Sequence, residues 1–317
     1  MLETLTINSL ETPKDGRSAM VSTQTHQLLA NLSQKTLSQM IDCEGVGLHS
    51  GKCISLRLVP AAADTGIIFR RTDVPAGQQM IPARYDNVVD TKLCTVISNE
   101  YGVKVGTIEH VMAALWAAEV DNVIVEVDGP EVPIMDGSSA PFLFLMQCAG
   151  VQEQDTLRSS LKVTESFTVV DGDKKIEFHP SETLKIDFEI DFDSKAIGKQ
   201  TFQFDGNPAA FRHDLARART FGFAQEVEWM RQNGLARGGS LENAVVVDGD
   251  TILNPEGLRY THEFVRHKIL DLIGDFYLAG APIVAHIKAT KAGHDLNNKA
   301  VHALHKHLSE CMAGETL

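Results

Sequence analysis

The order of the expected elements along the chain constrains the fold more than any other feature of the sequence. Twice, a series of short apolar runs with strand character comes before segments with the periodicity of a helix. Strands that precede helices, two times over, predict an α+β fold in which two similar sheet-and-helix sandwich domains pack together. In such a protein we expect the active site at the interface of the two domains, where clefts commonly form.

The expected elements can be placed by residue number. In the first half we expect strands at 54–59, 67–70, 95–98 and 122–127, and helices at 108–118 and 141–149. In the second half we expect strands at 162–170, 175–178, 184–192, 244–248 and 283–289, and helices near 207–217 and at 264–278. Thr107 is the expected N-cap of the helix at 108–118. Another helix is expected after residue 294.

The chain has 317 residues, which is enough for two domains with full cores. We expect a polar N-terminal extension at residues 1–36 that lies outside the fold. A first α+β domain at 37–155 and a second at 156–317 are expected to follow. The polar stretch Gln152–Ser160 is the expected linker between them.

Charge and cysteine content exclude several classes of protein. A formal net charge of −13 would repel nucleic acid, so no nucleic-acid partner is expected and any phosphate must be held locally. The five cysteines are odd in number and form no Cys-x-x-Cys pair, which predicts reduced thiols and a cytoplasmic protein. No apolar run approaches the roughly 20 residues that span a bilayer, so no transmembrane segment is expected.

A histidine and a carboxylate stand four residues apart in the helical pattern at 264–278. At this spacing, His267 and Asp271 leave the same face of the helix and can bind one metal ion, and Asp275 lies one turn further along that face. His110, in the helix at 108–118, is a candidate third ligand, and Glu109 would lie beside the ion. From spacing alone, a structural cluster of ion pairs is the better explanation of these residues.

A further histidine precedes the last expected helix. His294 follows a glycine in the loop that leads into this helix, where it is a candidate general acid. Two imidazoles and one carboxylate would leave a bound Zn²⁺ with a free coordination position, as in catalytic zinc sites. The residues alone leave both a catalytic metal site and a structural cluster open.

Six motifs together resemble the UDP-3-O-acyl-N-acetylglucosamine deacetylase family, the zinc amidohydrolases of early lipid A synthesis. The resemblance extends from about residue 37 to the end of the chain, with the motifs in order and compatibly spaced. They lie at 46–51, 107–110, 133–137, 218–223, 264–271 and 293–299.

The resemblance implies two α+β domains of similar topology and a role for each site residue. It implies that His110, His267 and Asp271 bind Zn²⁺, although Fe²⁺ would suit the same ligands. Glu109 then corresponds to the general base and His294 to the general acid. The remaining implied roles belong to Asp275, which holds His294, to Thr220 and Lys268 near the sugar, oxyanion and phosphates, and to an insert at about 222–250 that forms a passage for the acyl chain.

The implied substrate is an acylated UDP-N-acetylglucosamine, which the family hydrolyses at its acetamide in the committed step of lipid A biosynthesis. Such an amphiphilic substrate or product would allow peripheral contact with a membrane, and we expect a monomer. From the residues alone, ordinary core packing is the stronger explanation of the apolar candidates for substrate contact. The candidates are Leu93, Cys94, Phe192, Phe221, Val227, Ala236, Leu241, Val246 and Gly293.

Two other functions fit parts of the pattern. Two histidines and a carboxylate also suit a non-haem Fe(II) oxygenase, but an oxygenase needs neither the base Glu109 nor the acid His294. A sugar-nucleotide-binding protein with a structural metal is the other alternative. It would need a fourth ligand, from His49 or a cysteine, to close the coordination sphere.

Overall fold

The computed structural model describes residues 27–314 and contains two five-stranded sheets with the same strand order. In each sheet the last strand along the chain lies in the centre. It is antiparallel to one neighbour and parallel to the other. The first sheet has the order β2 (Ile41–Val46), β3 (Cys53–Pro60), β9 (Val123–Val127), β4 (Ile67–Arg71) and β5 (Met80–Pro82). The second has the order β11 (Phe167–Asp171), β12 (Lys174–His179), β19 (His286–Thr290), β13 (Lys185–Asp191) and β14 (Lys199–Phe204).

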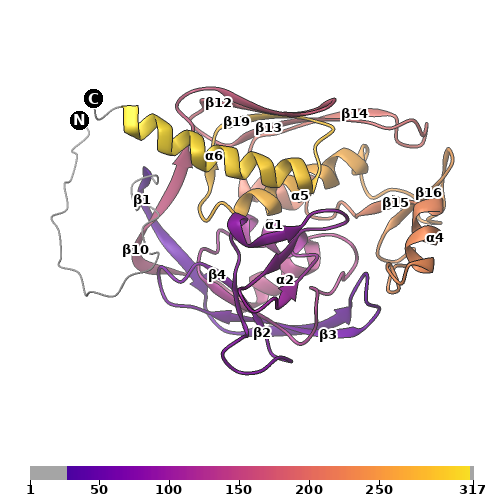
Figure 1. Ribbon diagram of the computed structural model, residues 1–317, viewed down its shortest axis with the longest axis horizontal. Coiled ribbons are helices and arrows are strands. Elements are labelled where there is room, and N and C mark those ends of the chain that lie inside the picture. Colours follow the sequence, from indigo (N-terminus) through magenta and orange to yellow (C-terminus); the bar gives the residue numbers. More distant parts are fainter. Residues whose placement is uncertain (1–26, 315–317) are drawn as a thin grey trace.

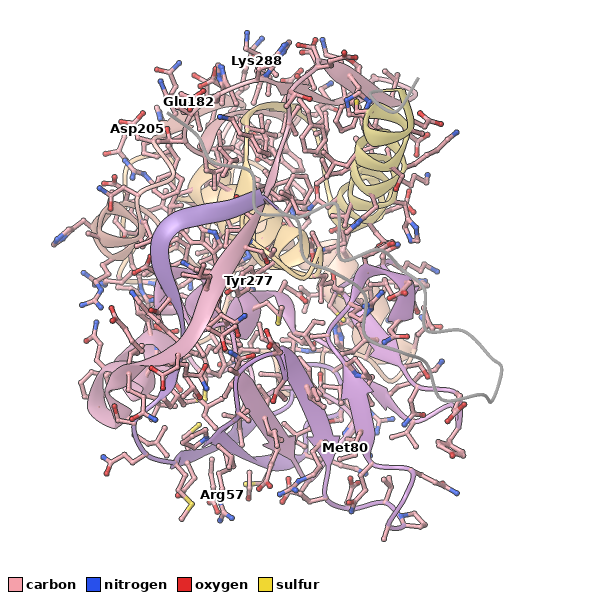
Figure 2. The ribbon with its side chains drawn as sticks, turned by 90° about the vertical axis from the view of Figure 1, so that its left-hand side faces the viewer. Arg57, Met80, Glu182, Asp205, Tyr277 and Lys288 are labelled. Atoms are coloured by element: carbon pink, nitrogen blue, oxygen red, sulfur yellow. The ribbon has the colours of Figure 1, made fainter. Side chains whose placement is uncertain are left out.

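Alternating apolar residues give each sheet one buried face. Successive side chains of a strand point to opposite faces, so every second residue faces the core. The buried residues are Ile54, Leu56 and Leu58 in β3 and Ile186, Phe188 and Ile190 in β13. Figure 2 shows the two sheets at opposite ends of the molecule, with Arg57 of β3 near one end, Lys288 of β19 near the other and Tyr277 between them.

Helices fill the space between the two sheets (Figure 1). Every residue of α1 is buried, as are most residues of α5, because these two helices pack against each other in the centre of the molecule. The α+β fold expected from the sequence is confirmed. The helices are α1 (Glu109–Ala117), α2 (Ala140–Ala149), α3 (Pro208–Asp214), α4 (Ala224–Gln232), α5 (Glu263–Tyr277) and α6 (His294–Gly314).

Each half also contains a small three-stranded sheet between the fourth strand of its large sheet and its central helix. The first small sheet follows the short 3₁₀ helix η1 (Tyr85–Asn87), and the second has α4 beside it. These two small sheets carry residues of the site described below. Their strands are β6 (Val88–Asp90), β7 (Val96–Ser98) and β8 (Lys104–Val105) in the first, and β15 (Phe221–Phe223), β16 (Val245–Asp248) and β17 (Thr251–Ile252) in the second.

The expectation that residues 1–36 lie outside the fold is wrong for residues 27–36, while residues 1–26 are outside the described part. Strand β1 (Gln27–Leu37) pairs with β10 (Val151–Lys162), which in turn pairs with β18 (Ile283–Val284). The stretch Gln152–Ser160, expected as a linker, is therefore a strand. Buried Arg158 anchors it through a 2.8 Å ion pair with Asp121.

The expected cap of α1 is also wrong. Ile108 occupies the N-cap position, and Thr107 has a positive φ of 55°. The Thr107 hydroxyl lies 3.5 Å from the carboxylate of Glu131, a buried acceptor, instead of capping the helix. Within residues 27–314, no helix is long and apolar enough to cross a membrane.

Candidate metal centre and adjoining cavities

Helices α1 and α5 approach each other closely at Gly274. A Cβ atom at this position would overlap the carbonyl oxygen of Glu109. Glycine, which lacks that atom, lets the backbones of the two helices come together here. The close approach brings Glu109 and His110 of α1 opposite the polar face of α5.

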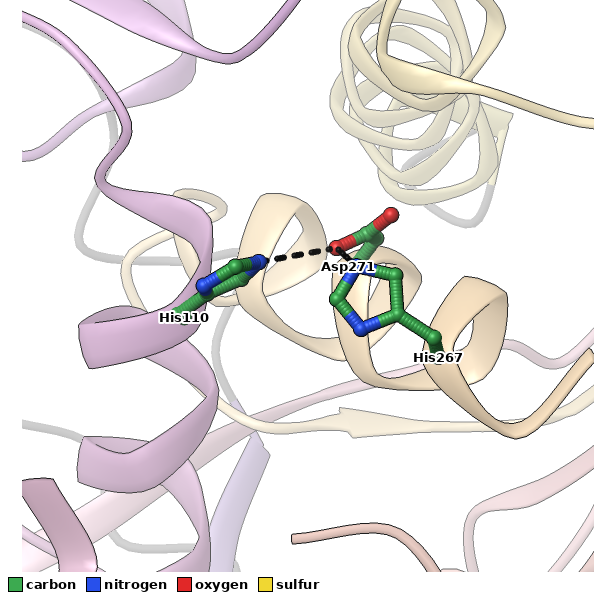
Figure 3. Close-up of side chains that lie close together, drawn as sticks. All are labelled: His110, His267 and Asp271. Atoms are coloured by element: carbon green, nitrogen blue, oxygen red, sulfur yellow. Dashed lines mark ion pairs between the residues drawn. The ribbon is translucent and has the colours of Figure 1, made fainter. Parts of the chain in front are cut away.

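His110, His267 and Asp271 converge at this contact (Figure 3). The Nε2 atoms of His110 and His267 lie 3.6 Å and 3.3 Å from Oδ1 of Asp271. One potential ligand atom from each residue lies within 4.8 Å of the others, and all three residues are buried. The three side chains that the sequence predicted as metal ligands are therefore close enough to bind one ion.

Neighbouring groups orient two of these side chains. The Nδ1–H of His267 donates to the carbonyl oxygen of Ala218 at 3.0 Å, which leaves Nε2 free to act as a ligand. Lys268 Nζ donates to Oδ2 of Asp271 at 2.8 Å. The other oxygen, Oδ1, is buried and accepts no hydrogen bond. A buried carboxylate oxygen without a donor is costly, so this atom fits a cation.

The charges of these residues suit a metal ligand set. Burial lowers the pKa of His267 to about 4, so the imidazole is neutral at pH 7 and can coordinate. Burial opposes ionisation of Asp271, but His267 and Lys268 outweigh it and hold its pKa well below the usual range. Burial likewise opposes the charge of Lys268, and Asp271 raises its pKa above the usual value.

A second group of side chains joins Glu109 to His294. The Nε2 atom of His294 lies 3.9 Å from Oε1 of Glu109, and its Nδ1–H donates to Oδ2 of Asp275 at 2.8 Å. Asn297 also donates to Oδ2 of Asp275 at 2.8 Å. Thr95 donates to Oδ1 of Asp275 through its hydroxyl at 2.5 Å and to Oε2 of Glu109 through its backbone N–H at 3.0 Å.

The surroundings shift the pKa values of Glu109 and His294 in the same direction, upward. Burial raises the pKa of Glu109, which makes its carboxylate a better proton acceptor than an exposed one. Burial alone would lower the pKa of His294, but the charge and hydrogen bond of Asp275 outweigh it and raise the pKa to about 9. At neutral pH the site therefore holds an imidazolium beside a buried carboxyl group.

A buried ion pair fixes the backbone next to the metal group. Arg219, which is 1% exposed, donates from Nε to Glu263 at 2.9 Å, and its backbone N–H donates to the same oxygen at 3.0 Å. Glu263 is the first residue of α5. The pair therefore holds the segment 218–220 against α5. The carbonyl oxygen of Ala218, which accepts the hydrogen bond of His267, belongs to this segment.

Two cavities meet beside the metal group. The larger, of about 770 Å³, contains polar and charged lining residues, among them Lys92, Lys174, Lys268 and His294. The other, of about 320 Å³, lies between β15, β16 and α4 and has mainly apolar walls. Thr220 and Phe221 line both cavities, so the two spaces adjoin at these residues.

The candidate substrate contacts divide between three cavities. Leu93, Phe192, Phe221 and Gly293 line the large polar cavity, whereas Phe221 also lines the apolar one, with Val227, Ala236, Leu241 and Val246. Cys94 lines neither; with Leu93 it borders a third cavity of about 470 Å³. Every candidate therefore borders one of these spaces.

Several residues of the site were not predicted from the sequence. Thr95, Asn297, Lys92, Lys174 and Arg219 contact site residues or line the large cavity. Asn297 and Arg219 lie within motifs at 293–299 and 218–223, which was a usable signal. Thr95 and the two lysines lie in short loops and strand ends, where no periodic pattern marks them.

The fourth ligand required for a structural metal is missing from the part of the chain described here. Within residues 27–314, the group that meets the distance requirement contains two histidines and one carboxylate, and neither His49 nor a cysteine. The ligand set is thus that of an open site rather than a closed one.

Comparisons with known proteins agree with one another. The family model described as UDP-3-O-acyl N-acetylglycosamine deacetylase (LpxC) matches residues 34–306. A protein of Shewanella frigidimarina is 49% identical over 273 residues, covering 86% of this chain and 89% of its own. Relatives from Idiomarina loihiensis and Myxococcus xanthus are 50% and 51% identical, and alignments cover 86% of this chain and 90% and 86% of theirs. All three relatives are named UDP-3-O-acyl-N-acetylglucosamine deacetylase.

Proposed function

This chain belongs to the UDP-3-O-acyl-N-acetylglucosamine deacetylase family, and from that premise we propose that it hydrolyses the acetamide of an acylated UDP-N-acetylglucosamine. The products are acetate and the free glucosamine amine, in the committed step of lipid A biosynthesis. The family membership confirms the resemblance found in the motifs. The observation that carries the proposal for this chain is the buried Oδ1 of Asp271, which accepts no hydrogen bond and lies between two histidines, with Glu109 and His294 alongside.

His110, His267 and Asp271 would hold the catalytic metal, which we propose to be Zn²⁺. When bound, such an ion polarises the carbonyl of the amide and lowers the pKa of water toward roughly 7. Fe²⁺ suits the same ligands. The second enzyme class considered above, an Fe(II) oxygenase, has no use for a carboxylate and an imidazolium 3.9 Å apart, which supports hydrolysis.

Glu109 acts as the general base in this proposal. Its carboxylate accepts the proton of the attacking water, and burial strengthens it for this role by raising its pKa. The backbone N–H of Thr95 holds Oε2, while Oε1 lies on the side of His294. Oε1 is therefore the oxygen available for the proton.

His294 acts as the general acid. With a pKa of about 9, it carries its proton at neutral pH, and Asp275 holds Nδ1 so that Nε2 is the donating atom. Donation of the Nε2 proton to the amine nitrogen lets the carbon–nitrogen bond break, and a neutral amine and acetic acid leave, the latter losing its proton to solvent to become acetate. The proton taken by Glu109 restores the imidazolium for the next turnover.

Substrate recognition divides between the two cavities. Lys92, Lys174 and Lys268 border the large cavity and supply local positive charge for the diphosphate of the substrate in an otherwise acidic protein. The apolar cavity between β15, β16 and α4 suits the acyl chain. Thr220, at the junction of both, would then lie next to the sugar, near the oxyanion that forms at the acetamide.

Phe192 is a candidate platform for the uracil ring. It borders the large cavity, and its ring lies 5.8 Å from that of Phe221 and 6.0 Å from that of Phe223. This aromatic cluster would hold the Phe192 ring in place for stacking.

A cytoplasmic location and a monomeric state complete the proposal. The odd number of cysteines and the lack of a Cys-x-x-Cys pair in the sequence support a reducing compartment. The amphiphilic substrate would bring the protein into peripheral contact with a membrane.

The proposal is tested by measuring acetate release from UDP-3-O-acyl-N-acetylglucosamine. Activity must disappear with a chelator, return with Zn²⁺, and stay absent in His267→Ala under both conditions. A folded, metal-loaded protein that releases no acetate would contradict the proposal. Return of activity with Fe²⁺ alone would identify the other metal.

A further inference from the structure

Thr95, beside the first small sheet, contacts both Glu109 and Asp275, the hydrogen-bond partner of His294. It comes directly before β7 and is 2% exposed. Its backbone N–H donates to Oε2 of Glu109 at 3.0 Å, and its hydroxyl donates to Oδ1 of Asp275 at 2.5 Å. Two donors of a single residue therefore hold one carboxylate on α1 and another on α5.

The hydroxyl completes the hydrogen bonding of Asp275. Oδ2 of Asp275 accepts from His294 and Asn297, both at 2.8 Å, and Oδ1 accepts from Thr95. A carboxylate that is held on both oxygens cannot turn about its terminal bond without losing a hydrogen bond. Its Oδ2 then stays in line with Nδ1 of His294, which fixes the direction of the opposite ring nitrogen.

We propose that Thr95 is a positioning residue of the reaction, which sets the Glu109 carboxylate and the His294 imidazole in register with each other through its backbone N–H and its hydroxyl. The inference rests on the proposed deacetylation. Thr95 does not touch the reacting atoms; it acts through Glu109 and Asp275 and through its hydroxyl oxygen, which also lies 3.4 Å from Nδ1 of His294. Since Nε2 of His294 and Oε1 of Glu109 lie only 3.9 Å apart, a small rotation of either changes the distance across which the substrate amide must fit.

A purely structural role is the competing explanation. The Thr95 side chain is buried, and a buried hydroxyl bonded to a carboxylate also contributes to stability. The two explanations differ in what they predict for turnover at constant folding. Positioning predicts a loss of kcat with little change in KM or metal affinity, and recovery when the hydroxyl returns.

The test compares Thr95→Val, which removes the hydroxyl but keeps the branched shape, with Thr95→Ser, which keeps it. We expect Thr95→Val to lower kcat by about 10- to 100-fold, with KM changed by no more than about twofold. Thr95→Ser is expected to retain kcat within about threefold. Zn²⁺ affinity, measured by competition with a chelating dye, is expected to stay unchanged in both.

Thr36→Val is the matched control. Thr36 is also 2% exposed, and its hydroxyl donates to the carbonyl oxygen of Asn122 at 2.7 Å, outside the site. This variant is expected to lose stability without losing kcat. If Thr95→Val behaves like Thr36→Val, or if Thr95→Ser is as slow as Thr95→Val, the positioning role is wrong.

A measurement without substrate separates this inference from the proposed function. In the zinc-loaded protein, the NMR signal of the His294 Nδ1 proton is expected to shift in Thr95→Val and to return toward its original position in Thr95→Ser. An unchanged signal in Thr95→Val overturns the inference even if the enzyme is active. If Thr95→Val does not fold, Thr95→Ala provides the same comparison, and an inactive wild-type protein would refute the deacetylation alone.

Discussion

The two large sheets have the same strand order, yet the central helices of the two halves bring different chemistry to the site. Helix α1 of the first half supplies Glu109 and one potential metal ligand, His110. Helix α5 of the second half supplies two potential ligands, His267 and Asp271, together with Asp275, the partner of the acid. Equal topology has therefore not produced equal sites. The fold places the two helices face to face, and each helix contributes different side chains to the site.

The small sheets show the same contrast. Both interrupt their half between the fourth strand of the large sheet and the central helix. The first is bordered by Thr95, which contacts Glu109 and Asp275, whereas the second, with α4, forms the walls of the apolar cavity. If both proposals hold, the small sheet at the same position of the topology orients catalytic groups in the first half and forms the space for substrate in the second.

The largest effect on the difference between the two helices is expected when Glu109, the proposed base on α1, is replaced. Glu109→Gln is expected to lower kcat by about 10²–10⁴-fold, because the amide cannot accept the proton of water. Bound Zn²⁺, measured by atomic absorption, is expected to remain at the wild-type level. A variant that loses its metal would make Glu109 a ligand and remove the contrast between the two helices.

The buried ion pair between Arg219 and Glu263, which lies directly before β15 of the second small sheet, is expected to be important for stability. Glu263→Gln leaves the buried Arg219 with one charged partner, the more exposed Glu256 at 2.6 Å, so we expect a loss of unfolding free energy above about 1 kcal/mol but below the about 3–5 kcal/mol of a fully broken buried pair. Urea denaturation measures the loss. Glu189→Gln, which disrupts a more exposed 3.0 Å pair with Lys199, is the control and is expected to cost less than about 1 kcal/mol. Equal losses would contradict the anchoring role.

Gly274→Ala tests the contact at which the halves meet. In an ordinary helix this change stabilises by about 0.5–1 kcal/mol, since alanine has the better helix propensity. Here the added Cβ overlaps the carbonyl oxygen of Glu109, so we expect destabilisation by about 1–3 kcal/mol instead. Thermal unfolding gives the sign. A stabilised variant would mean that the helices separate without cost.

The apolar cavity is expected to affect only the fit of the acyl chain. Val227→Phe narrows it, and we expect KM to rise about tenfold for long acyl chains and by less than twofold for short ones. Val170→Phe, on an exposed residue of β11, is the control. Equal effects on both chain lengths would place the acyl group elsewhere.

The smallest expected effect is on the pH dependence of activity, through His294, the proposed acid, which Asp275 of α5 holds. The active form of His294 is the imidazolium, and its pKa is raised to about 9. On the basic side, activity is therefore expected to be halved near pH 9 and to decline further as the pH rises, whereas protonation of the base Glu109 limits it separately at low pH. Asp275→Asn removes the charge that raises the pKa, so the decline is expected at lower pH. An unshifted profile would assign the basic limb to another group.

The sequence predicted those parts of the molecule that have a strong local pattern. Helices α1 and α5, and the convergence of His267 with Asp271, follow from helical periodicity, which places residues four apart on one face. Strand β10 was missed because its residues are mostly polar, and its pairing with β1 joins segments far apart in the sequence. Pairing of this kind depends on tertiary contacts rather than on local propensity.

The site was predicted from its chemically distinctive residues and missed where ordinary residues act through geometry. Histidines and carboxylates stand out at fixed spacings, whereas Thr95 is one threonine among many. Its role depends on a hydroxyl that meets Asp275 from a different half of the chain. The sequence also did not predict the positive φ of Thr107. The partner of its hydroxyl, Glu131, lies in a later segment of the chain.

The order in which the site residues occur along the chain has a consequence for biosynthesis. Glu109 and His110 leave the ribosome early, His267 and Asp271 much later, and His294 only with the start of α6. A nascent chain can thus form its first sheet while it still lacks most of the metal group and the whole of the acid. The proposed catalytic group can therefore be complete only after the start of α6 has been made, directly behind β19, the central strand of the second sheet.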